Sequence, residues 1–127
     1  MPLDKTYINA QQLLDDSWAL GLQVLDSGWA PDLLVGVWRG GTPVAIAMHE
    51  LLDYLGLRCD HLPIKTSLYT GLNETAQQVR VEGLQALLQR PAPGSRVLLV
   101  DDVFDSGRSL AQVVREIRAA RGVESPE

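Results

Sequence analysis

Residues 97–110, VLLVDDVFDSGRSL, place a cluster of polar groups directly after an apolar run. The acids Asp101 and Asp102 come first, and Ser106 and Ser109 follow with a glycine and an arginine between them. Adjacent carboxylates can accept hydrogen bonds from hydroxyl groups or hold a divalent cation. Glycine and serine at a helix start suit a phosphate, because unpaired backbone N–H groups point at the anion there. The segment therefore predicts a site for a phosphorylated sugar such as a ribose 5-phosphate.

Two elements must position these groups. Residues 96–101 predict a buried strand, and a helix is predicted to begin near Ser106 or Gly107. The apolar face of that helix is Leu110, Val113, Val114 and Ile117. In open α/β sheets, ligands bind at the carboxyl ends of the strands, where this segment lies. The alternative is structural: Asp101 ends the strand and Ser106 caps the helix.

The first half of the chain predicts a helix, a strand and a second helix. Asn9 can cap the first helix and Gly28 can end it. The apolar face predicted for this helix is Leu14, Trp18, Leu22 and Leu25. Residues 32–38, DLLVGVW, suit a parallel strand that is buried on both faces. After a glycine turn, Thr42 and Pro43 predict the N-cap and first residue of the second helix.

The middle of the chain has weaker patterns. Residues 57–65 predict a strand with Pro63 at an edge or near its end. Residues 66–78 predict a long loop, with a hairpin running into VRVEG as the alternative, and long loops in compact domains commonly serve a function. A short helix, LQALLQ, follows. The whole pattern predicts one α/β domain over residues 1–127, a parallel sheet with helices on both faces.

Composition excludes several classes of protein. The formal charge of −5 over 127 residues argues against a nucleic-acid or membrane-surface binder, because such partners require a cationic face. No apolar run approaches the roughly 20 residues of a membrane span. The single cysteine, Cys59, is interpreted as a half-buried strand thiol and indicates a reducing, cytoplasmic location. His49 and His61 are interpreted as surface or helix-packing residues.

The segment VLLVDDVFDSGRS resembles the phosphoribosyl pyrophosphate (PRPP) motif of type I phosphoribosyltransferases, whose fold is a Rossmann-like parallel sheet flanked by helices. LLVGVWRGGTPVA is similar to the family's first strand and pyrophosphate loop. The resemblance implies that Asp101 and Asp102 receive the ribose hydroxyls, directly or through Mg²⁺. It implies that the 5-phosphate is bound by Ser106, Gly107, Arg108 and Ser109. It also implies that pyrophosphate is bound by Trp38, Arg39 and Gly40. Serine stands at Ser106 and Ser109 where the family usually has threonine.

Asp105 resembles the acid of the branch that uses 6-oxopurines: hypoxanthine, guanine or xanthine. A carboxylate there can accept a ring proton and make the purine more nucleophilic; the alternative is an acid that stabilises the helix start. The implied enzyme is a purine-salvage pentosyltransferase that moves a phosphoribosyl group from PRPP to the base and releases pyrophosphate. Lys65, Ser67 and Tyr69 are similar to the family's mobile loop, although Leu68 separates the last two here. Lys65 is equally consistent with a solvated strand end.

After the last predicted helix only VESPE remains, whereas the family continues into a segment that recognises the base. We therefore expect this chain to lack the base-recognition segment. Three explanations stay open: the chain is a truncated product, a partner completes its site, or it is a reduced member of the family that binds PRPP without selecting a base. Two alternative functions stay open: transfer to a pyrimidine or another base, and PRPP or nucleotide sensing without catalysis. A homodimer is expected from the family and from the open sheet edge.

Overall fold

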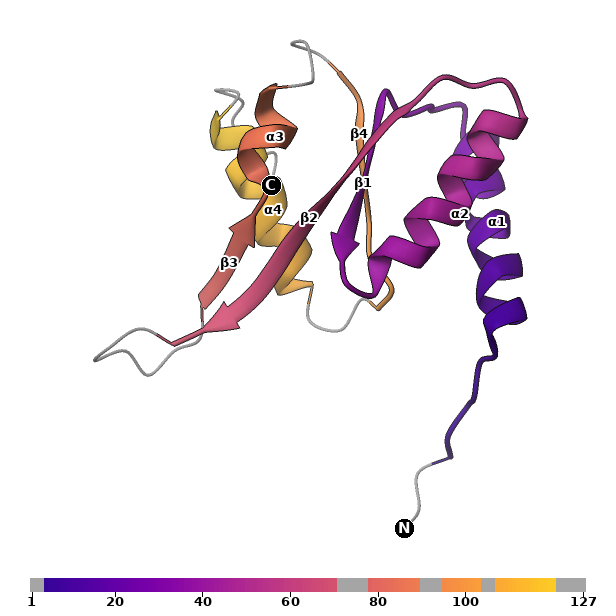
Figure 1. Cartoon of the computed structure of the whole chain (residues 1–127), viewed down its shortest axis with the longest axis horizontal. Coiled ribbons are helices and arrows are strands. Elements are labelled where there is room, and N and C mark those ends of the chain that lie inside the picture. The colour runs from indigo at the N-terminus through magenta and orange to yellow at the C-terminus, as the bar shows by residue number, and fades with distance from the viewer. Residues whose placement is uncertain (1–3, 71–77, 90–94, 104–106, 121–127) are drawn as a thin grey trace.

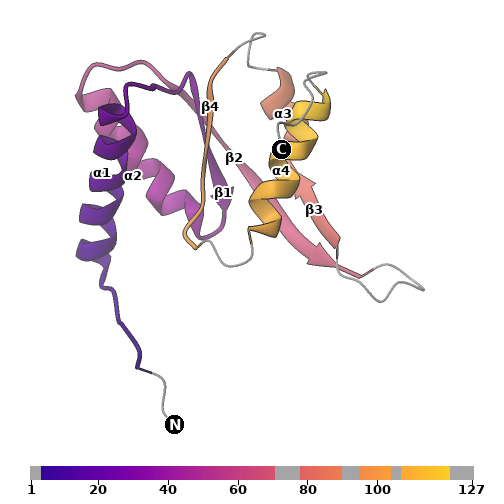
Figure 2. The ribbon, with the colours of Figure 1, turned by 180° about the vertical axis from the view of Figure 1, so that it is seen from behind.

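The chain folds into a mixed four-stranded sheet with helices on both faces (Figures 1 and 2). The computed structural model describes residues 4–70, 78–89, 95–103 and 107–120. The strands are β1 (Leu33–Trp38), β2 (Asp60–Tyr69), β3 (Gln78–Glu82) and β4 (Val97–Val100), in the order β3-β2-β1-β4. β1 is parallel to β2 and β4, whereas β3 is antiparallel to β2. The predicted α/β class is confirmed, with β3 as one antiparallel edge.

Each face of the sheet carries two helices. The helices are α1 (Ala10–Asp26), α2 (Gly41–Tyr54), α3 (Leu84–Gln89) and α4 (Arg108–Ala120). In both views α1 and α2 lie on one side of the sheet, and α3 and α4 lie on the other (Figures 1 and 2). In the described part of the chain, no helix combines the length and the apolar character that crossing a membrane requires.

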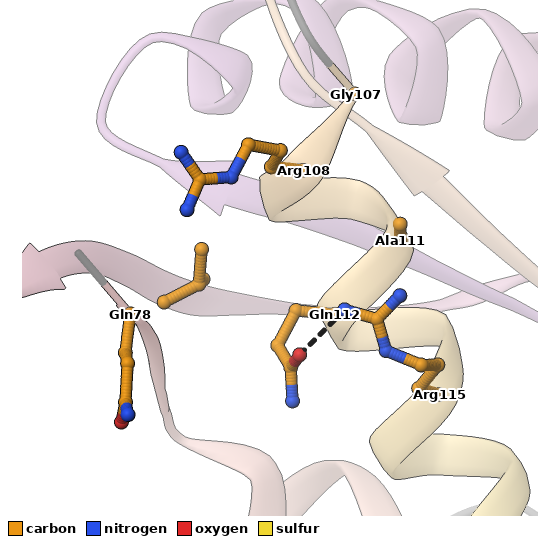
Figure 3. A pocket seen from close by; sticks show the side chains of 7 residues that line it. Gln78, Gly107, Arg108, Ala111, Gln112 and Arg115 are labelled. Atoms are coloured by element: carbon orange, nitrogen blue, oxygen red, sulfur yellow. Dashed lines mark hydrogen bonds between the residues drawn. The ribbon is translucent and has the colours of Figure 1, made fainter. Parts of the chain in front are cut away.

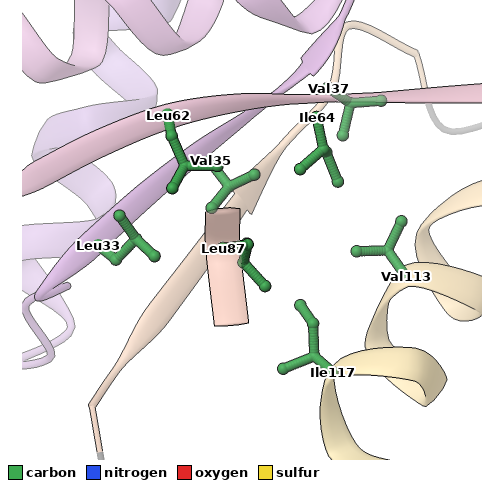
Figure 4. Close-up of a cluster of buried hydrophobic side chains, with 8 residues drawn as sticks. All are labelled: Leu33, Val35, Val37, Leu62, Ile64, Leu87, Val113 and Ile117. Carbon is green, nitrogen blue, oxygen red and sulfur yellow. The ribbon is translucent and has the colours of Figure 1, made fainter. Parts of the chain in front are cut away.

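β1 is the centre of the core, and its side chains alternate between the two faces. Leu33, Val35 and Val37 join the cluster under α3 and α4 (Figure 4). The other members of this cluster are Leu62, Ile64, Leu87, Val113 and Ile117. Leu34 points to the opposite face and packs with α2, so the prediction of a strand buried on both faces is confirmed. A Cβ at Gly36 would lie 2.9 Å from the Cβ of Ala45, which shows how closely α2 approaches β1.

β2 begins at Asp60, three residues later than predicted, and extends farther than predicted, to Tyr69. The loop prediction for residues 66–78 was wrong at both ends, because β2 continues to Tyr69 and Gln78 begins β3. Register pairs Thr66 with Val81 and Tyr69 with Gln78, so the hairpin alternative is confirmed. The antiparallel partner provides the backbone hydrogen bonds that keep this polar segment extended. Pro63 pairs with Gly36 of β1 and precedes the β3 pairing, so its missing N–H leaves that side of the ladder intact.

α1 begins as predicted but buries a different face. Asn9 caps the helix through a pair of hydrogen bonds. Its side-chain Oδ1 accepts the backbone N–H of Gln12 at 2.8 Å, and the side-chain Oε1 of Gln12 accepts the backbone N–H of Asn9 at 2.9 Å. The predicted apolar face was wrong at Trp18 and Leu22, which are 39% and 45% exposed. Ser17 and Gly21 are buried instead. A Cβ at Gly21 would come within 2.9 Å of Leu51, so small residues allow α1 to pack closely on α2 and displace the larger ones to the flank.

The start of α2 also differs from the prediction. Gly40 occupies the N-cap and α2 begins at Gly41, so the prediction of Thr42 as the N-cap was wrong. The turn after β1 is only Arg39 and Gly40, and it therefore places Thr42 inside the first helical turn. The Thr42 Oγ1 atom is buried there without a hydrogen-bond partner in the described part of the chain.

Asp32 and Arg96 join the amino ends of β1 and β4. The Arg96 N–H donates to Asp32 Oδ2 at 2.8 Å, and the guanidinium lies 3.4 Å from the same carboxylate. In return, the N–H groups of Asp32 and Leu33 donate to the Arg96 carbonyl. The backbone hydrogen bond from Arg96, with its guanidinium, lowers the pKa of Asp32. These contacts help to set the register of β1 against β4, and therefore the levels at which the two strands end.

Cys59 is half-buried, as predicted, but it lies directly before β2 and not within the strand. Burial raises the pKa of its thiol to about 11, and the carboxylates of Asp32 and Asp60 add to the rise. We expect iodoacetamide at pH 8 to alkylate Cys59 about 100-fold more slowly than the same cysteine in denaturant, because only the thiolate reacts. Mass spectrometry of the alkylated protein across pH 7 to 11 measures this rate. Equal rates in the folded and denatured protein would contradict it.

Candidate active site

The residues predicted to bind a phosphorylated sugar meet at one edge of the sheet. β1 and β4 are parallel neighbours, with Gly36 paired to Val100, so their carboxyl ends lie side by side. The segment from Trp38 to Gly40 leaves β1 at this edge, and Asp101 and Asp102 leave β4. Two segments about sixty residues apart in the sequence thus form one site, as expected at the carboxyl edge of an open α/β sheet.

Two glycines allow these segments to touch. A Cβ at Gly40 would overlap the Asp102 carboxylate. A Cβ at Gly41 would lie 2.5 Å from the Val100 carbonyl oxygen and 2.7 Å from the Cα of Asp101. The Gly41 contacts are with backbone atoms, so this position requires glycine at this separation of the strands, whereas a side chain at Gly40 would have to displace the exposed Asp102 carboxylate. The turn after β1 and the start of α2 therefore lie in direct contact with the acid pair.

The two carboxylates are held by the backbone that follows them. Asp101 Oδ1 accepts the N–H of Asp102 at 2.8 Å, and Asp102 Oδ1 accepts the N–H of Val103 at 2.9 Å. Partial burial raises the pKa of Asp101, and the side chain of Asp102 adds to the rise. Each hydrogen bond engages one oxygen of a carboxylate that can accept several, so the pair retains capacity for hydroxyl groups or a cation.

The donor chemistry of the acid pair fits Mg²⁺. Magnesium prefers oxygen ligands and is commonly held by one or two protein carboxylates together with water and substrate phosphates. Asp101 and Asp102 supply two carboxylates at the site edge. Within the described ranges there is no cluster of three or more His, Cys, Asp or Glu side chains that could bind a metal ion.

The predicted pyrophosphate loop is exposed beside β2. Trp38 is 50% exposed, Arg39 is exposed, and the peptide bond between them is cis. The Arg39 carbonyl accepts the N–H of Thr42 at 3.3 Å and links the turn to α2. Lys65 of β2 pairs with Trp38 in the parallel register and is exposed, so the structure brings this predicted residue to the same edge of the sheet.

Ser67 and Tyr69 lie farther from the acid pair along β2. Ser67 pairs with Arg80 and Tyr69 pairs with Gln78, both in β3. β1 ends opposite Lys65, so β2 and β3 continue past it as a two-stranded ribbon (Figure 1). The positions of Lys65 and Ser67 alternate with those of Leu62 and Ile64, which face the α3–α4 core, so both lie on the opposite face of the sheet.

The predicted phosphate segment is described from Gly107 onward. Gly107 has φ of 75°, a conformation that favours glycine, and its carbonyl accepts the N–H of Ala111 at 2.9 Å as α4 begins. Arg108 is exposed and Ser109 is half-buried in the first turn. The predicted base Asp105 and the phosphate ligand Ser106 lie outside the described residues, so their assigned roles stay predictions.

One pair of neighbouring side chains, His49 and His61, was not predicted from the sequence. His49 of α2 and His61 of β2 have ring centroids 4.2 Å apart, and His49 Nε2 lies 2.9 Å from the Cys59 carbonyl oxygen. They share the wall of a cavity of about 360 Å³ with Trp38 and Thr42. The histidines are twelve positions apart in the sequence, and only the packing of α2 beside β2 brings them together. No sequence pattern of local spacing signals this contact.

Comparison with known proteins adds a family assignment. The model of the phosphoribosyl transferase domain family matches residues 5–125. No curated protein sequence matches significantly. A purine phosphoribosyltransferase from Pyrococcus horikoshii Ot3 superposes with a TM-score of 0.66 and 26% identity, covering 93% of this chain and 70% of that one.

Two further solved structures share the fold. A hypothetical protein from Neisseria gonorrhoeae with bound ppGpp has a TM-score of 0.69 and 23% identity, covering 89% of this chain and 62% of its own. The xanthine-guanine-hypoxanthine phosphoribosyltransferase of Helicobacter pylori has a TM-score of 0.62 and 24% identity, with coverages of 91% and 67%.

This chain thus spans 62% to 70% of the lengths of these three structures. The fold and the enzyme family expected from the sequence are confirmed. With the acid pair and the glycine turn side by side at the sheet edge, and with the family model matching nearly the whole length, the chain belongs to the phosphoribosyl transferase domain family.

Proposed function

We propose that this chain transfers a 5-phosphoribosyl group from PRPP to a 6-oxopurine and releases pyrophosphate. The observation that carries the proposal is the contact between the Gly40 turn and the Asp102 carboxylate. It joins a turn suited to the leaving pyrophosphate to an acid pair suited to the ribose hydroxyls. The structural relatives named as purine phosphoribosyltransferases support the purine as acceptor.

The chemistry requires charge stabilisation on both sides of the breaking bond. As the anomeric carbon separates from pyrophosphate, the sugar gains positive charge and the leaving group gains negative charge. Asp101 and Asp102 orient the ribose through its hydroxyls, and Arg39 with the turn amides offers positive charge to pyrophosphate. Bound Mg²⁺, held by the acid pair, would supply further charge neutralisation to pyrophosphate. Residues 66–78, which were predicted as a functional loop, are proposed to exclude water from the reacting sugar.

Asp105 is proposed as the residue that accepts a ring proton from the purine. Replacing it with Asn keeps the size of the side chain but removes the base, so kcat for a purine should fall by about 10² to 10⁴ while PRPP affinity changes little. The purified chain is incubated with PRPP, Mg²⁺ and hypoxanthine, guanine, xanthine or uracil, and released pyrophosphate is measured. Arg108→Gln changes the adjacent 5-phosphate segment and should instead raise the KM for PRPP, which distinguishes loss of phosphate binding from loss of the proton acceptor.

The outcomes of this assay separate the candidate functions. Pyrophosphate release with one or more purines, lost in Asp105→Asn, supports the proposal. Release only with uracil would assign transfer to a pyrimidine. PRPP binding without release for any base would favour the PRPP-sensing alternative and contradict the proposed activity.

A homodimer in the cytoplasm is part of the proposal. Trp38 and Ile46 are 50% and 54% exposed, and with Leu14 and Pro43 they line an apolar depression beside the predicted pyrophosphate loop. Apolar surface that borders a binding loop commonly marks a protein contact. We expect light scattering after size exclusion to give a dimer mass, and Ile46→Lys to give a monomer. A monomer mass for the unaltered chain would contradict the dimer.

A further inference from the structure

The cavity of about 360 Å³ beside the two histidines, the α2–β2 pocket, lies between one side of α2 and the strands β1 and β2. Its α2 members include Thr42, Ile46, His49 and Glu50. The last three follow Thr42 by four, seven and eight positions, so all four share one side of the helix. Every lining residue lies between residues 34 and 63, so one helix and two adjacent parallel strands form the whole pocket.

The α2–β2 pocket is separate from the predicted phosphoribosyl site. Neither Asp101 nor Asp102 lines it. Gly107 and Arg108 of the predicted 5-phosphate segment line a different cavity, at the start of α4 (Figure 3). Since α4 and α2 cover opposite faces of the sheet, the two cavities lie on opposite faces as well (Figures 1 and 2).

Trp38 supplies an aromatic wall to the α2–β2 pocket. Leu34 and Gly36 of the same strand face α2, so the Trp38 side chain, two positions farther along, lies on the same face. The proposed contacts to pyrophosphate come from Arg39 and the turn amides, which leaves the indole ring without a part in the reaction. Half of Trp38 is exposed, so its ring is accessible to a ligand.

The pocket and the apolar depression assigned to the dimer extend in opposite directions. Both are lined by Trp38 and Ile46. The depression continues toward Leu14 of α1, whereas the α2–β2 pocket continues toward Pro63 of β2. A partner seated on the α1 side would therefore leave the β2 side of these two residues open.

The polar groups of the α2–β2 pocket favour a ligand that donates hydrogen bonds. Glu50 is the one carboxylate among the lining residues, no lysine or arginine accompanies it, and it has no ion pair or hydrogen bond within the described ranges. His49 Nε2 lies 2.9 Å from the Cys59 carbonyl oxygen, which can only accept, so Nδ1 of the neutral ring is an acceptor. The buried Thr42 Oγ1, which has no partner in the described part of the chain, is costly to leave unpaired.

We propose that the α2–β2 pocket binds a flat aromatic or heteroaromatic ring that carries a cationic amino or amidino group. Its volume falls within the range of about 300 to 1,000 Å³ typical of small-molecule pockets, and Trp38, Ile46 and Pro63 offer apolar surface to the ring. The cation is attracted to the Glu50 carboxylate and to the face of the indole. Glu50 repels anions such as PRPP, and the net charge of −5 adds to that repulsion.

Nuclear magnetic resonance titration of the ¹⁵N-labelled full chain tests this proposal at constant ionic strength. The probes are benzamidine, its neutral analogue benzamide and the anion benzoate, which have similar size and shape. The backbone amides of Ala45, His49 and Leu62 report binding. We expect saturable shifts with benzamidine, binding of benzamide at least about tenfold weaker because a charged hydrogen bond is lost, and no saturable shifts with benzoate.

Two substitutions separate the charge from the apolar wall. Glu50→Gln should weaken benzamidine about tenfold and leave benzamide within about twofold, because only the cation depends on the carboxylate. Trp38→Leu should weaken both probes about threefold, since both contact the ring. Asp53→Asn is the matched control for Glu50→Gln, because it makes the same charge change on an exposed position of α2 outside the pocket lining. It should stay within about twofold of the unaltered chain.

The acid pair at the sheet edge also attracts cations, so the benzamidine titration is repeated with Asp101→Asn and Asp102→Asn combined. The shifts of the pocket amides should persist in this variant. Absence of saturable shifts with benzamidine, equal binding of benzoate, or equal weakening in Glu50→Gln and Asp53→Asn would overturn the proposal. Loss of the shifts in the acid-pair variant would also overturn it, because the cation would then bind at the sheet edge.

Discussion

Replacing Asp101 and Asp102 together with Asn is expected to lower kcat/KM for PRPP by about 10² to 10⁴. Each carboxylate that hydrogen-bonds a ribose hydroxyl or supports a cation contributes about 1.5 to 3 kcal/mol as a charged group. Asn keeps the shape and one carbonyl oxygen, so the loss reports charge rather than packing. Calorimetric titration with PRPP, with and without Mg²⁺, together with steady-state rates, measures the effect.

The control for this double variant is Asp15→Asn with Asp16→Asn. These two adjacent acids are exposed on α1, so the same change in net charge occurs away from the sheet edge. We expect the control to bind PRPP within about twofold of the unaltered chain, as for surface substitutions. Binding that survives in the Asp101 and Asp102 variant, or that falls equally in the control, would contradict the assigned role of the acid pair.

Gly40→Ala is the second substitution expected to have a large effect. The new methyl group would occupy the place of the Asp102 carboxylate and force it to move. Because this carboxylate is exposed and can move, the cost in stability is that of its hydrogen bond from the Val103 N–H, about 0.5 to 1.5 kcal/mol, whereas displacement of a site residue by about 1 Å can lower the rate about 100-fold. The backbone of Gly40 has φ of −67° and ψ of −33°, which Ala adopts readily, so the effect is steric. Thermal unfolding and steady-state rates measure both parts.

A double-mutant cycle with Asp102→Ala identifies the contact responsible. When the carboxylate is absent, Gly40→Ala should reduce the free energy of unfolding by less than about 0.5 kcal/mol, because the group that it displaces is gone. Gly41→Ala should lower the free energy of unfolding equally with and without Asp102→Ala, since its Cβ would meet the backbone at Val100 and Asp101. Equal losses from Gly40→Ala in both backgrounds would contradict the proposed contact.

Most of the elements could be predicted because local patterns specify them. The apolar run Leu33–Val37 is buried on both faces as its composition indicates, and Asn9 caps α1 through its own side chain. The predictions of secondary structure and burial were wrong where the position of a residue depends on a neighbour in space. Thr66–Tyr69 is extended because β3 lies beside it. The buried face of α1 is set by how closely Ser17 and Gly21 allow α2 to approach, so the larger Trp18 and Leu22 remain outside.

The residue types of the candidate site were determined by the sequence alone. Asp101 and Asp102 end a strand, and Gly107 precedes a helix, because short-range backbone preferences fix both boundaries. Tertiary structure decided which of these groups meet. The parallel pairing of β1 with β4 places Gly40 against Asp102, and the packing of α2 beside β2 brings the rings of His49 and His61 together. Contacts across such distances along the chain depend on sheet order and on close packing, which no local pattern encodes.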